Sequence, residues 1–138
     1  MIFFTDENIS KYAAYMLCYV EQKHQVRAHL DYFNSGTPDT EWMREVASWK
    51  EEESTVVVCG DSRILKNKVE KQVLKECGVT FVLLARGWTN LGWQDFAWKI
   101  VKVWPEIIKN VEHARYPMVF EVMVGTLKIT SRGRISEL

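Results

Sequence analysis

The sequence predicts an α/β three-layer fold with a central, mainly parallel sheet. Short apolar runs alternate with stretches whose apolar residues recur at helical spacing, in the order strand, helix, strand, helix, strand, helix, strand. Two of the runs, residues 56–59 and 79–84, are continuously apolar, as in strands that are buried on both faces of a parallel sheet. The chain has 138 residues, of which 47% are hydrophobic, enough for one compact core.

The chain opens with a predicted strand at residues 2–4 that leads directly into two acids, Asp6 and Glu7. Asn8 follows and is a candidate cap for a helix, because its side chain can accept a hydrogen bond from a free backbone N–H. The apolar positions of that helix follow the helical repeat: Ile9, Tyr12, Ala13, Met16, Leu17 and Val20.

A second strand is predicted at residues 25–30, followed by a polar loop at 31–36. Residues 37–39, Thr-Pro-Asp, predict a helix start: the hydroxyl can cap, Pro fits the first turn, and the helix dipole favours an acid there. We expect this helix to run to about residue 52. Its predicted buried residues are Trp42, Met43, Val46 and Trp49.

The strand at residues 56–59 is followed by Gly-Asp-Ser at 60–62. A short helical segment and then a helix at 68–77 are expected next, with Gly78 as the C-terminal cap. The run at residues 79–84 is the next buried strand.

A long helical pattern covers residues 93–112, but Pro105 interrupts it. We expect a break or kink near Val103, with Pro105 starting a second helix. The apolar residues at 118–124 and 127–130 flank a Gly-Thr pair and predict a terminal β-hairpin. The acid Asp95 lies near the start of the long helix.

The expected organisation is a domain at residues 1–114, with the hairpin and a basic tail at 115–138 packed on the same domain. Lys and Arg balance Asp and Glu, 18 against 18, so any binding to polyanions must come from local patches. No export signal or membrane-length apolar run is present, which predicts a cytoplasmic protein without a membrane partner. Reduced thiols are expected, because the three cysteines show no CxxC spacing. They are Cys18, Cys59 and Cys77.

Acids follow two of the predicted strands. Parallel strands bring their carboxyl ends to one edge of the sheet, where ligands bind in this fold class. Asp6 and Asp61 therefore lie close together if their strands are adjacent, and the helix that begins near Pro38 can add Asp39. Clustered carboxylates raise one another's pKa, and a divalent cation such as Mg²⁺ or Mn²⁺ relieves that repulsion. Such a site can activate water for phosphodiester hydrolysis.

Each acid also has a purely structural explanation. Asp6, Glu7 and Asp39 precede or open helices, whose N-termini stabilise negative charge. Asp61, after a buried strand and a glycine, is the strongest single candidate. The predicted convergence of three acids at one edge is more informative than any of them alone.

Three segments resemble the acidic motifs of PIN-like domains: Thr-Asp-Glu-Asn-Ile-Ser at 5–10, Pro-Asp-Thr-Glu-Trp at 38–42, and Val-Val-Cys-Gly-Asp-Ser-Arg-Ile-Leu at 57–65. The most similar branch opens with a Leu-Asp-Glu-Asn-like strand end and includes the VapC-type toxins of toxin–antitoxin pairs. Residues 92–107, from Gly-Trp to Trp-Pro-Glu-Ile, also resemble the tail of that branch. The resemblance covers residues 2 to about 112.

The resemblance implies a metal-dependent ribonuclease that is inhibited by a cognate antitoxin. Ser62 would be the hydroxyl that orients water beside the third acid. The family usually has a fourth acid near the start of a later helix, for which Asp95 is the nearest candidate, with Glu7 or Glu41 as alternatives. The residues carried over as Mg²⁺ or Mn²⁺ ligands are Asp6, Asp39 and Asp61.

Cations near the third acid are candidates for holding an RNA backbone: Arg63, Lys66 and Lys68. Trp88 and Trp93 lie in a polar connection and could line an RNA groove, but burial or a partner interface is the favoured explanation. The exposed hairpin edge or the helix that contains Trp93 could mediate a homodimer.

Two other functions remain open. A receiver-like phosphoacceptor domain also gathers acids at this edge, but it needs a Lys after a late strand, where this chain has Ala-Arg-Gly at 85–87. A catalytically silent PIN-like module for protein binding is the second alternative. The sequence favours the ribonuclease toxin.

Overall fold

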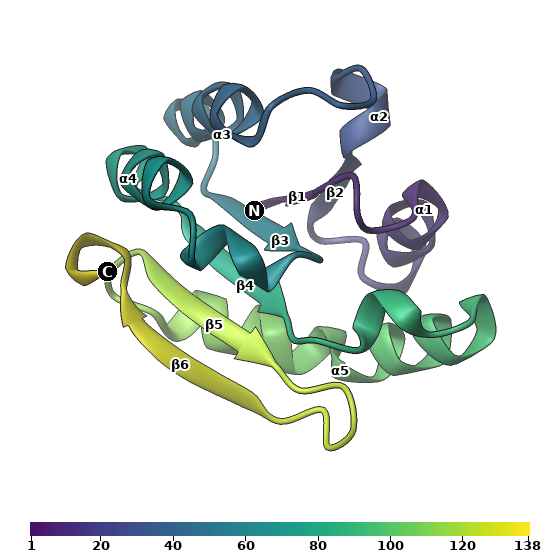
Figure 1. Cartoon of the computed structure of the whole chain (residues 1–138). Coiled ribbons are helices and arrows are strands. Elements are labelled where there is room, and N and C mark those ends of the chain that lie inside the picture. The colour runs from purple at the N-terminus through teal and green to yellow at the C-terminus, as the bar shows by residue number, and fades with distance from the viewer.

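The computed structural model describes residues 1–138 and has a single six-stranded sheet with helices on both faces (Figure 1). The strand order is β2-β1-β3-β4-β5-β6; the first five strands are mutually parallel, and β6 is antiparallel to β5. The predicted α/β class is confirmed. The strands are β1 (Ile2–Thr5), β2 (Gln25–Ala28), β3 (Thr55–Cys59), β4 (Thr80–Leu84), β5 (Met118–Val122) and β6 (Ile129–Arg134).

Helices cover both faces of the sheet. They are α1 (Lys11–Val20), α2 (His29–Tyr32), α3 (Asp39–Ser48), α4 (Lys68–Cys77) and α5 (Trp93–His113). Helices α1 and α5 pack on one face in a cluster of 22 buried residues, and α3 and α4 pack on the other in a cluster of 18. Figure 1 shows α3 and α4 together on the side opposite α5.

The alternation of side chains along each strand supplies both clusters. In β1, Phe3 packs in the α1/α5 cluster and Phe4 in the α3/α4 cluster, because successive side chains point to opposite faces. All four residues of β1 are buried, which explains why its sequence is a continuous apolar run. The pairing of β1 with β3 confirms the adjacency on which the predicted meeting of Asp6 and Asp61 depends.

The first helix begins later than predicted. Ser10, not Asn8, is its N-cap, and the Ser10 hydroxyl accepts a hydrogen bond from the backbone N–H of Tyr12 at 3.2 Å. Asn8 instead donates its side-chain amide to Asp6. The prediction was wrong because two neighbouring residues can both cap a helix, and the nearby acid engages one of them.

The start of α3 also differs in detail. The Thr37 hydroxyl donates to the carbonyl of Asn34 at 2.7 Å, so it closes the preceding turn and does not cap the helix. Pro38 precedes the first helical residue, Asp39, and has no side-chain capping bond. The regular helix ends at Ser48 and continues as a 3-10 turn at Trp49–Glu51. The four side chains predicted to be buried on this segment are buried.

Pro105 lies inside α5 and does not start a second helix, so the predicted break is wrong. Proline removes one helical hydrogen bond, a cost of about 3 kcal/mol in a helix interior. Pro105 itself is exposed. Buried residues before and after it pack on the same sheet face and hold the helix together: Phe96, Ile100, Val103, Trp104, Ile107, Ile108 and Val111.

The terminal hairpin is present with shifted bounds. The segment between β5 and β6 is longer than the predicted Gly-Thr turn, because Leu127 adopts a φ of 57°, which is incompatible with an extended strand. The basic residues Arg132 and Arg134 therefore belong to β6.

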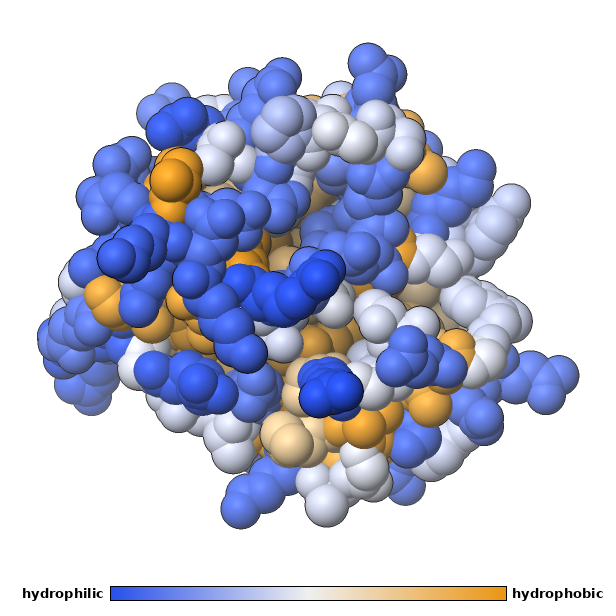
Figure 2. Space-filling model, viewed as in Figure 1, coloured by the Kyte–Doolittle hydropathy of each residue, from blue (hydrophilic) through white to orange (hydrophobic).

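The surface carries mixed polarity. Hydrophilic residues are scattered over the face shown in Figure 2, and apolar residues appear mainly between them. No helix combines the length and apolar composition that a crossing of the bilayer would need.

Candidate functional site

Asp6 is held at the carboxyl edge of the sheet by the end of the neighbouring strand. Its Oδ1 accepts a hydrogen bond from the backbone N–H of Gly60 at 3.0 Å. Its Oδ2 accepts from the Cys59 thiol at 3.1 Å and from the Asn8 amide at 3.2 Å. The pairing of β1 with β3 places Cys59 and Gly60 beside Asp6, whereas Asn8 follows Asp6 in the chain. Asp6 is only 3% exposed.

Burial raises the pKa of Asp6 above its ordinary value, although hydrogen bonds from Gly60, Cys59 and Asn8 oppose the shift. The negative charge of Asp39 raises it further, so the two carboxyls lie near enough to interact. Burial also keeps the pKa of the Cys59 thiol well above its ordinary value, so the thiol stays protonated and remains a donor to Asp6.

Asp39 is the first residue of α3 and is half-buried. Its Oδ1 accepts a hydrogen bond from the indole N–H of Trp42 at 2.8 Å. Trp42 is buried in the core, so the packing of α3 fixes the orientation of the acid.

Asp61 follows β3 and forms a close pair with Arg63. Its Oδ1 accepts from the backbone N–H of Arg63 at 3.0 Å and from the guanidinium Nε at 2.9 Å, and its Oδ2 accepts from Nη2 at 2.9 Å. These bonds hold the pKa of Asp61 below its ordinary value. The Arg63 side chain is 82% exposed, so this pair lies at the surface.

Glu70, which the sequence analysis did not include, joins the acids. It lies in the first turn of α4, where Asn67 is the N-cap and accepts from the backbone N–H of Glu70 at 3.1 Å. Burial raises the pKa of Glu70, and so do the charge of Asp39, a hydrogen bond shared with Asp39, and the charge of Asp61. The sequence signal was an acid in the first turn of the helix that follows the Asp61 loop.

Pairwise interactions thus link acids from four segments: Asp6 interacts with Asp39, and Glu70 interacts with Asp39 and Asp61. Asp95 is exposed in the first turn of α5, the helix on the other face of the sheet, and contributes no charge or hydrogen bond to Asp6, Asp61 or Glu70. Glu41 is exposed on α3 and is likewise not among the groups that act on these three acids.

Glu7 orders a neighbouring loop. Its carboxylate accepts hydrogen bonds from the Ser35 hydroxyl and from the backbone N–H of Gly36, which lower the pKa of Glu7. The ring Nε2 of the buried His29 lies 3.7 Å from the same carboxylate. These contacts account for Glu7 as a structural residue beside the acids.

The four acids offer only oxygen ligands, the kind that Mg²⁺ and Mn²⁺ prefer. Burial is the main cause of the raised pKa values of Asp6 and Glu70, and neighbouring carboxylates add to both; a bound cation would favour the ionised forms. As the side chains stand, no three His, Cys, Asp or Glu residues are grouped closely enough to hold an ion, and Asp61 is turned to Arg63. The donor set fits such a cation in chemistry and charge, and a cation would compete with Arg63 for Asp61.

A polar pocket of about 350 Å³ lies beside the acids and has no hydrophobic lining residue. We call it the cationic pocket, because it contains Arg63, Lys66 and Arg86. Lys66 and Arg86 form no ion pair within the chain. Ser62 and Asp61 also line the pocket, whereas Lys68 is exposed at the start of α4 and does not. Arg86, at the end of β4, was missed by the sequence analysis.

Gly60 allows these segments to approach closely. A Cβ at this position would lie 3.0 Å from Asn8 Cβ and 3.3 Å from Ile9 Cγ1 and Thr89 Cγ2. A side chain here would therefore push apart the loops that surround Asp6.

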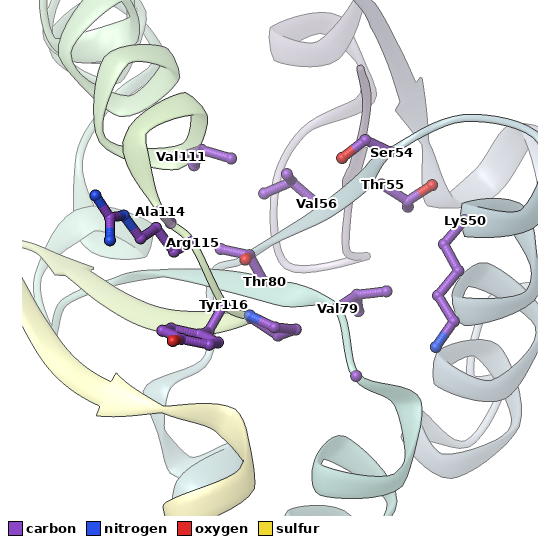
Figure 3. A pocket seen from close by; sticks show the side chains of 12 residues that line it. Lys50, Ser54, Thr55, Val56, Val79, Thr80, Val111, Ala114, Arg115 and Tyr116 are labelled. Atoms are coloured by element: carbon purple, nitrogen blue, oxygen red, sulfur yellow. The ribbon is translucent and has the colours of Figure 1, made fainter.

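The opposite edge of the sheet has different chemistry. A pocket of about 430 Å³ lies there, with Arg115 and Tyr116 on one side and Lys50 on the other (Figure 3). It has no Asp or Glu among its lining residues. The Lys50 amine donates to the carbonyl of Cys77 at 2.7 Å, so it acts as a structural contact between helices. This pocket therefore does not offer the carboxylates that are found at the carboxyl edge.

The comparisons with known proteins identify the family. The model of the PIN-like domain matches residues 1–86, which include β1 to β4 and all four clustered acids. No curated protein and no solved structure matches the chain. The match covers well over half of the chain. The chain therefore belongs to the PIN-like domain family.

Proposed function

We propose that this chain is a Mg²⁺- or Mn²⁺-dependent endoribonuclease and the toxin of a toxin–antitoxin pair of the VapC type. The observation that supports the nuclease is the chain of pairwise interactions among four acids from separate segments at the carboxyl edge of the sheet: Asp6 with Asp39, and Glu70 with Asp39 and Asp61. Membership of the PIN-like family supports the same reaction class, because these domains are commonly nucleases.

Each acid has a distinct part in the proposed mechanism. Asp6 is the anchored ligand, since three hydrogen bonds fix its carboxylate. Asp39 is oriented by the indole of Trp42, and Glu70 takes the place of the fourth acid instead of Asp95. The chemistry supplied by Mg²⁺ or Mn²⁺ when bound there is activation of a water and neutralisation of charge on the phosphodiester.

The residues around Asp61 would handle the substrate. Ser62 lines the cationic pocket beside Asp61, where its hydroxyl can orient the attacking water. Arg63 pairs with Asp61, and its guanidinium would be available to a phosphate oxygen if Asp61 held a cation. Lys66 and Arg86 hold the RNA backbone in this proposal, because both are cations without an internal partner.

The test is cleavage of total RNA by the purified protein with Mn²⁺ or Mg²⁺, with and without EDTA. Metal-dependent cleavage is expected for the wild type and for Asp95→Asn, which is the matched control for an acid outside the cluster. Asp6→Asn, Asp61→Asn and Glu70→Gln are expected to reduce cleavage by at least about a hundredfold while remaining folded by thermal unfolding. Expression of the wild type, but not of Asp6→Asn, should arrest cell growth if the protein is a toxin.

Other outcomes would change the assignment. Loss of cleavage in Asp95→Asn but not in Glu70→Gln would restore Asp95 as the fourth acid. No cleavage by any form, with cation binding shown by calorimetry, would favour the catalytically silent protein-binding module. Growth that continues while RNA is cleaved in vitro would reject the toxin role and leave the nuclease intact.

A further inference from the structure

A second pocket of about 410 Å³ adjoins the cationic pocket at the same edge of the sheet. We call it the aromatic pocket, because four of its lining residues are Tyr12, Trp88, Trp93 and Phe96. Asn8 and Thr89 line both pockets, so the two are adjacent and share a wall. The same Asn8 side chain donates to Asp6, which places the shared wall directly beside the acids.

The aromatic pocket has a fixed floor and an open wall. Trp88 is fully buried, and its indole N–H donates to the carbonyl of Val122 at 2.9 Å. Phe96 packs edge-on against Trp88 with ring centroids 5.6 Å apart. Trp93 lies nearly parallel to Phe96, at an interplanar angle of 13°, and is 47% exposed. An exposed tryptophan beside a rigid aromatic floor offers a flat face on which another ring can stack.

Hydrogen-bonding groups at the shared wall are available to a ligand. The Thr89 hydroxyl and the amide oxygen of Asn8 make no hydrogen bond within the chain, whereas the amide nitrogen of Asn8 is committed to Asp6. On the other side of this wall, Lys66 and Arg86 have no ion partner. A ligand that spans both pockets would thus present a flat ring, polar edges and an adjacent negative charge.

We propose that the aromatic pocket binds an unpaired nucleobase of single-stranded RNA whose adjoining phosphate lies in the cationic pocket. The inference rests on the proposed function and specifies its substrate as a strand with at least one unstacked base at the cleavage site. Base–aromatic stacking is tolerant of sequence, because every base has a π face, whereas paired bases in a duplex are not free to enter. A partner protein that filled only the aromatic pocket would make no use of the unpaired cations beside it.

Binding in EDTA tests the proposal separately from cleavage. The probe is a labelled, unstructured RNA of about 12 nucleotides, followed by fluorescence anisotropy at low salt, beside the same strand with abasic sugars and a blunt duplex. Trp93→Ala should weaken binding of the intact strand about tenfold, and Trp93→Phe should keep it within about threefold of the wild type. Trp98→Ala is the matched control, because Trp98 is 52% exposed on the same helix but does not line the pocket.

The abasic strand separates stacking from charge. Wild type and Trp93→Ala should bind the abasic strand equally weakly, whereas Arg86→Ala should weaken binding of intact and abasic strands by the same factor. The duplex should bind less tightly than the single strand and should be insensitive to Trp93→Ala.

Three results would overturn the proposal. Trp93→Ala could bind the intact strand as tightly as the wild type does, or it could weaken binding of the abasic strand as much as binding of the intact strand. The wild type could also fail to bind the intact strand. The first of these would favour an apolar segment of a partner protein as the occupant. If RNA is cleaved but Trp93→Ala does not change RNA binding, the base-binding proposal is rejected and the nuclease proposal is retained. If Trp93→Ala weakens binding of the intact strand but no RNA is cleaved, the RNA-binding site is retained and the nuclease proposal is rejected.

Discussion

The carboxyls of Asp61 and Glu70 lie close enough to interact, yet their pKa values shift in opposite directions. Hydrogen bonds from the exposed Arg63 lower the pKa of Asp61, whereas burial and the neighbouring Asp39 raise the pKa of Glu70. The pKa of Asp6 is also raised, chiefly by burial. Two of the four acids thus have raised pKa values, mainly because burial penalises the ionised carboxylate and secondarily because other carboxylates lie nearby.

The raised pKa of Glu70, caused by burial and by its acidic neighbours, predicts that Glu70→Gln stabilises the metal-free protein near neutral pH. A raised folded-state pKa favours the protonated form, so the wild type loses stability as pH rises through that pKa. The neutral amide avoids this loss, and the gain should be about 0.5 kcal/mol, since solvent partly screens the half-buried carboxyl. The gain should vanish below about pH 4, where Glu70 is protonated in both the folded and unfolded states.

Urea unfolding in EDTA near pH 7 and near pH 4 measures this difference. Glu45→Gln is the matched control, because Glu45 is exposed on α3 and its carboxylate has no hydrogen-bond partner in the chain. A loss of stability near neutral pH in Glu70→Gln, or a gain that persists at low pH, would contradict a raised pKa for Glu70.

Among the elements, the sequence predicted the buried strands better than the helix starts. Strands β1, β3 and β4 are buried on both faces, so their apolar runs leave little ambiguity. The start of α1 was misplaced because Asn8 and Ser10 can both cap, and only the folded structure shows that Asp6 engages Asn8.

The choice of Glu70 over Asp95 as the proposed fourth acid also could not be made from the sequence. Both α4 and α5 carry an acid in the first turn, Glu70 and Asp95. Local patterns do not tell which of the two helices packs on the face that bears Asp39. That choice depends on which sheet face each helix covers, and the packing of the whole chain decides it.

The continuous helix α5 leads to a prediction about its proline. Pro105 is exposed and cannot donate the helical hydrogen bond, so Pro105→Ala should restore that bond without loss of core contacts. The free energy of unfolding should rise by about 1–3 kcal/mol. Glu106→Ala, the adjacent exposed position, should change it by less than about 0.5 kcal/mol in the same denaturant titration. A destabilised Pro105→Ala would mean that α5 depends on a bend at this residue.

At the scale of the whole molecule, a net charge of zero conceals local separation of charge. Acids dominate one side of the Asp61 loop, and cations without partners dominate the adjoining pocket. The pair of Asp61 and Arg63 lies at the boundary and joins the two regions. The balanced composition excluded a general attraction to polyanions, but the fold gathers cations in the cationic pocket, where a polyanion can be attracted locally.

The C-terminal hairpin lies beyond the residues matched by the family model, yet it completes both cores. Val119 and Val122 of β5 are fully buried on opposite faces, and the carbonyl of Val122 accepts from the backbone of Ala85 and from the indole of Trp88. A chain that ends at residue 116 would expose one side of β4 and release the floor of the aromatic pocket. We therefore expect it to lose cooperative unfolding, which a urea titration followed by tryptophan fluorescence would show.

A single substitution in β5 tests the contribution of the hairpin to the free energy of unfolding. Val119→Ala should lower the free energy of unfolding by about 2 kcal/mol, because it leaves a cavity in a fully buried position. Lys128→Ala, at an exposed position between the two hairpin strands, is the control and should be nearly neutral. Cooperative, near-native unfolding of the truncated chain would show that the matched region folds without β5. In that case the hairpin would be an attachment on an independent domain and not the fifth and sixth strands of its sheet.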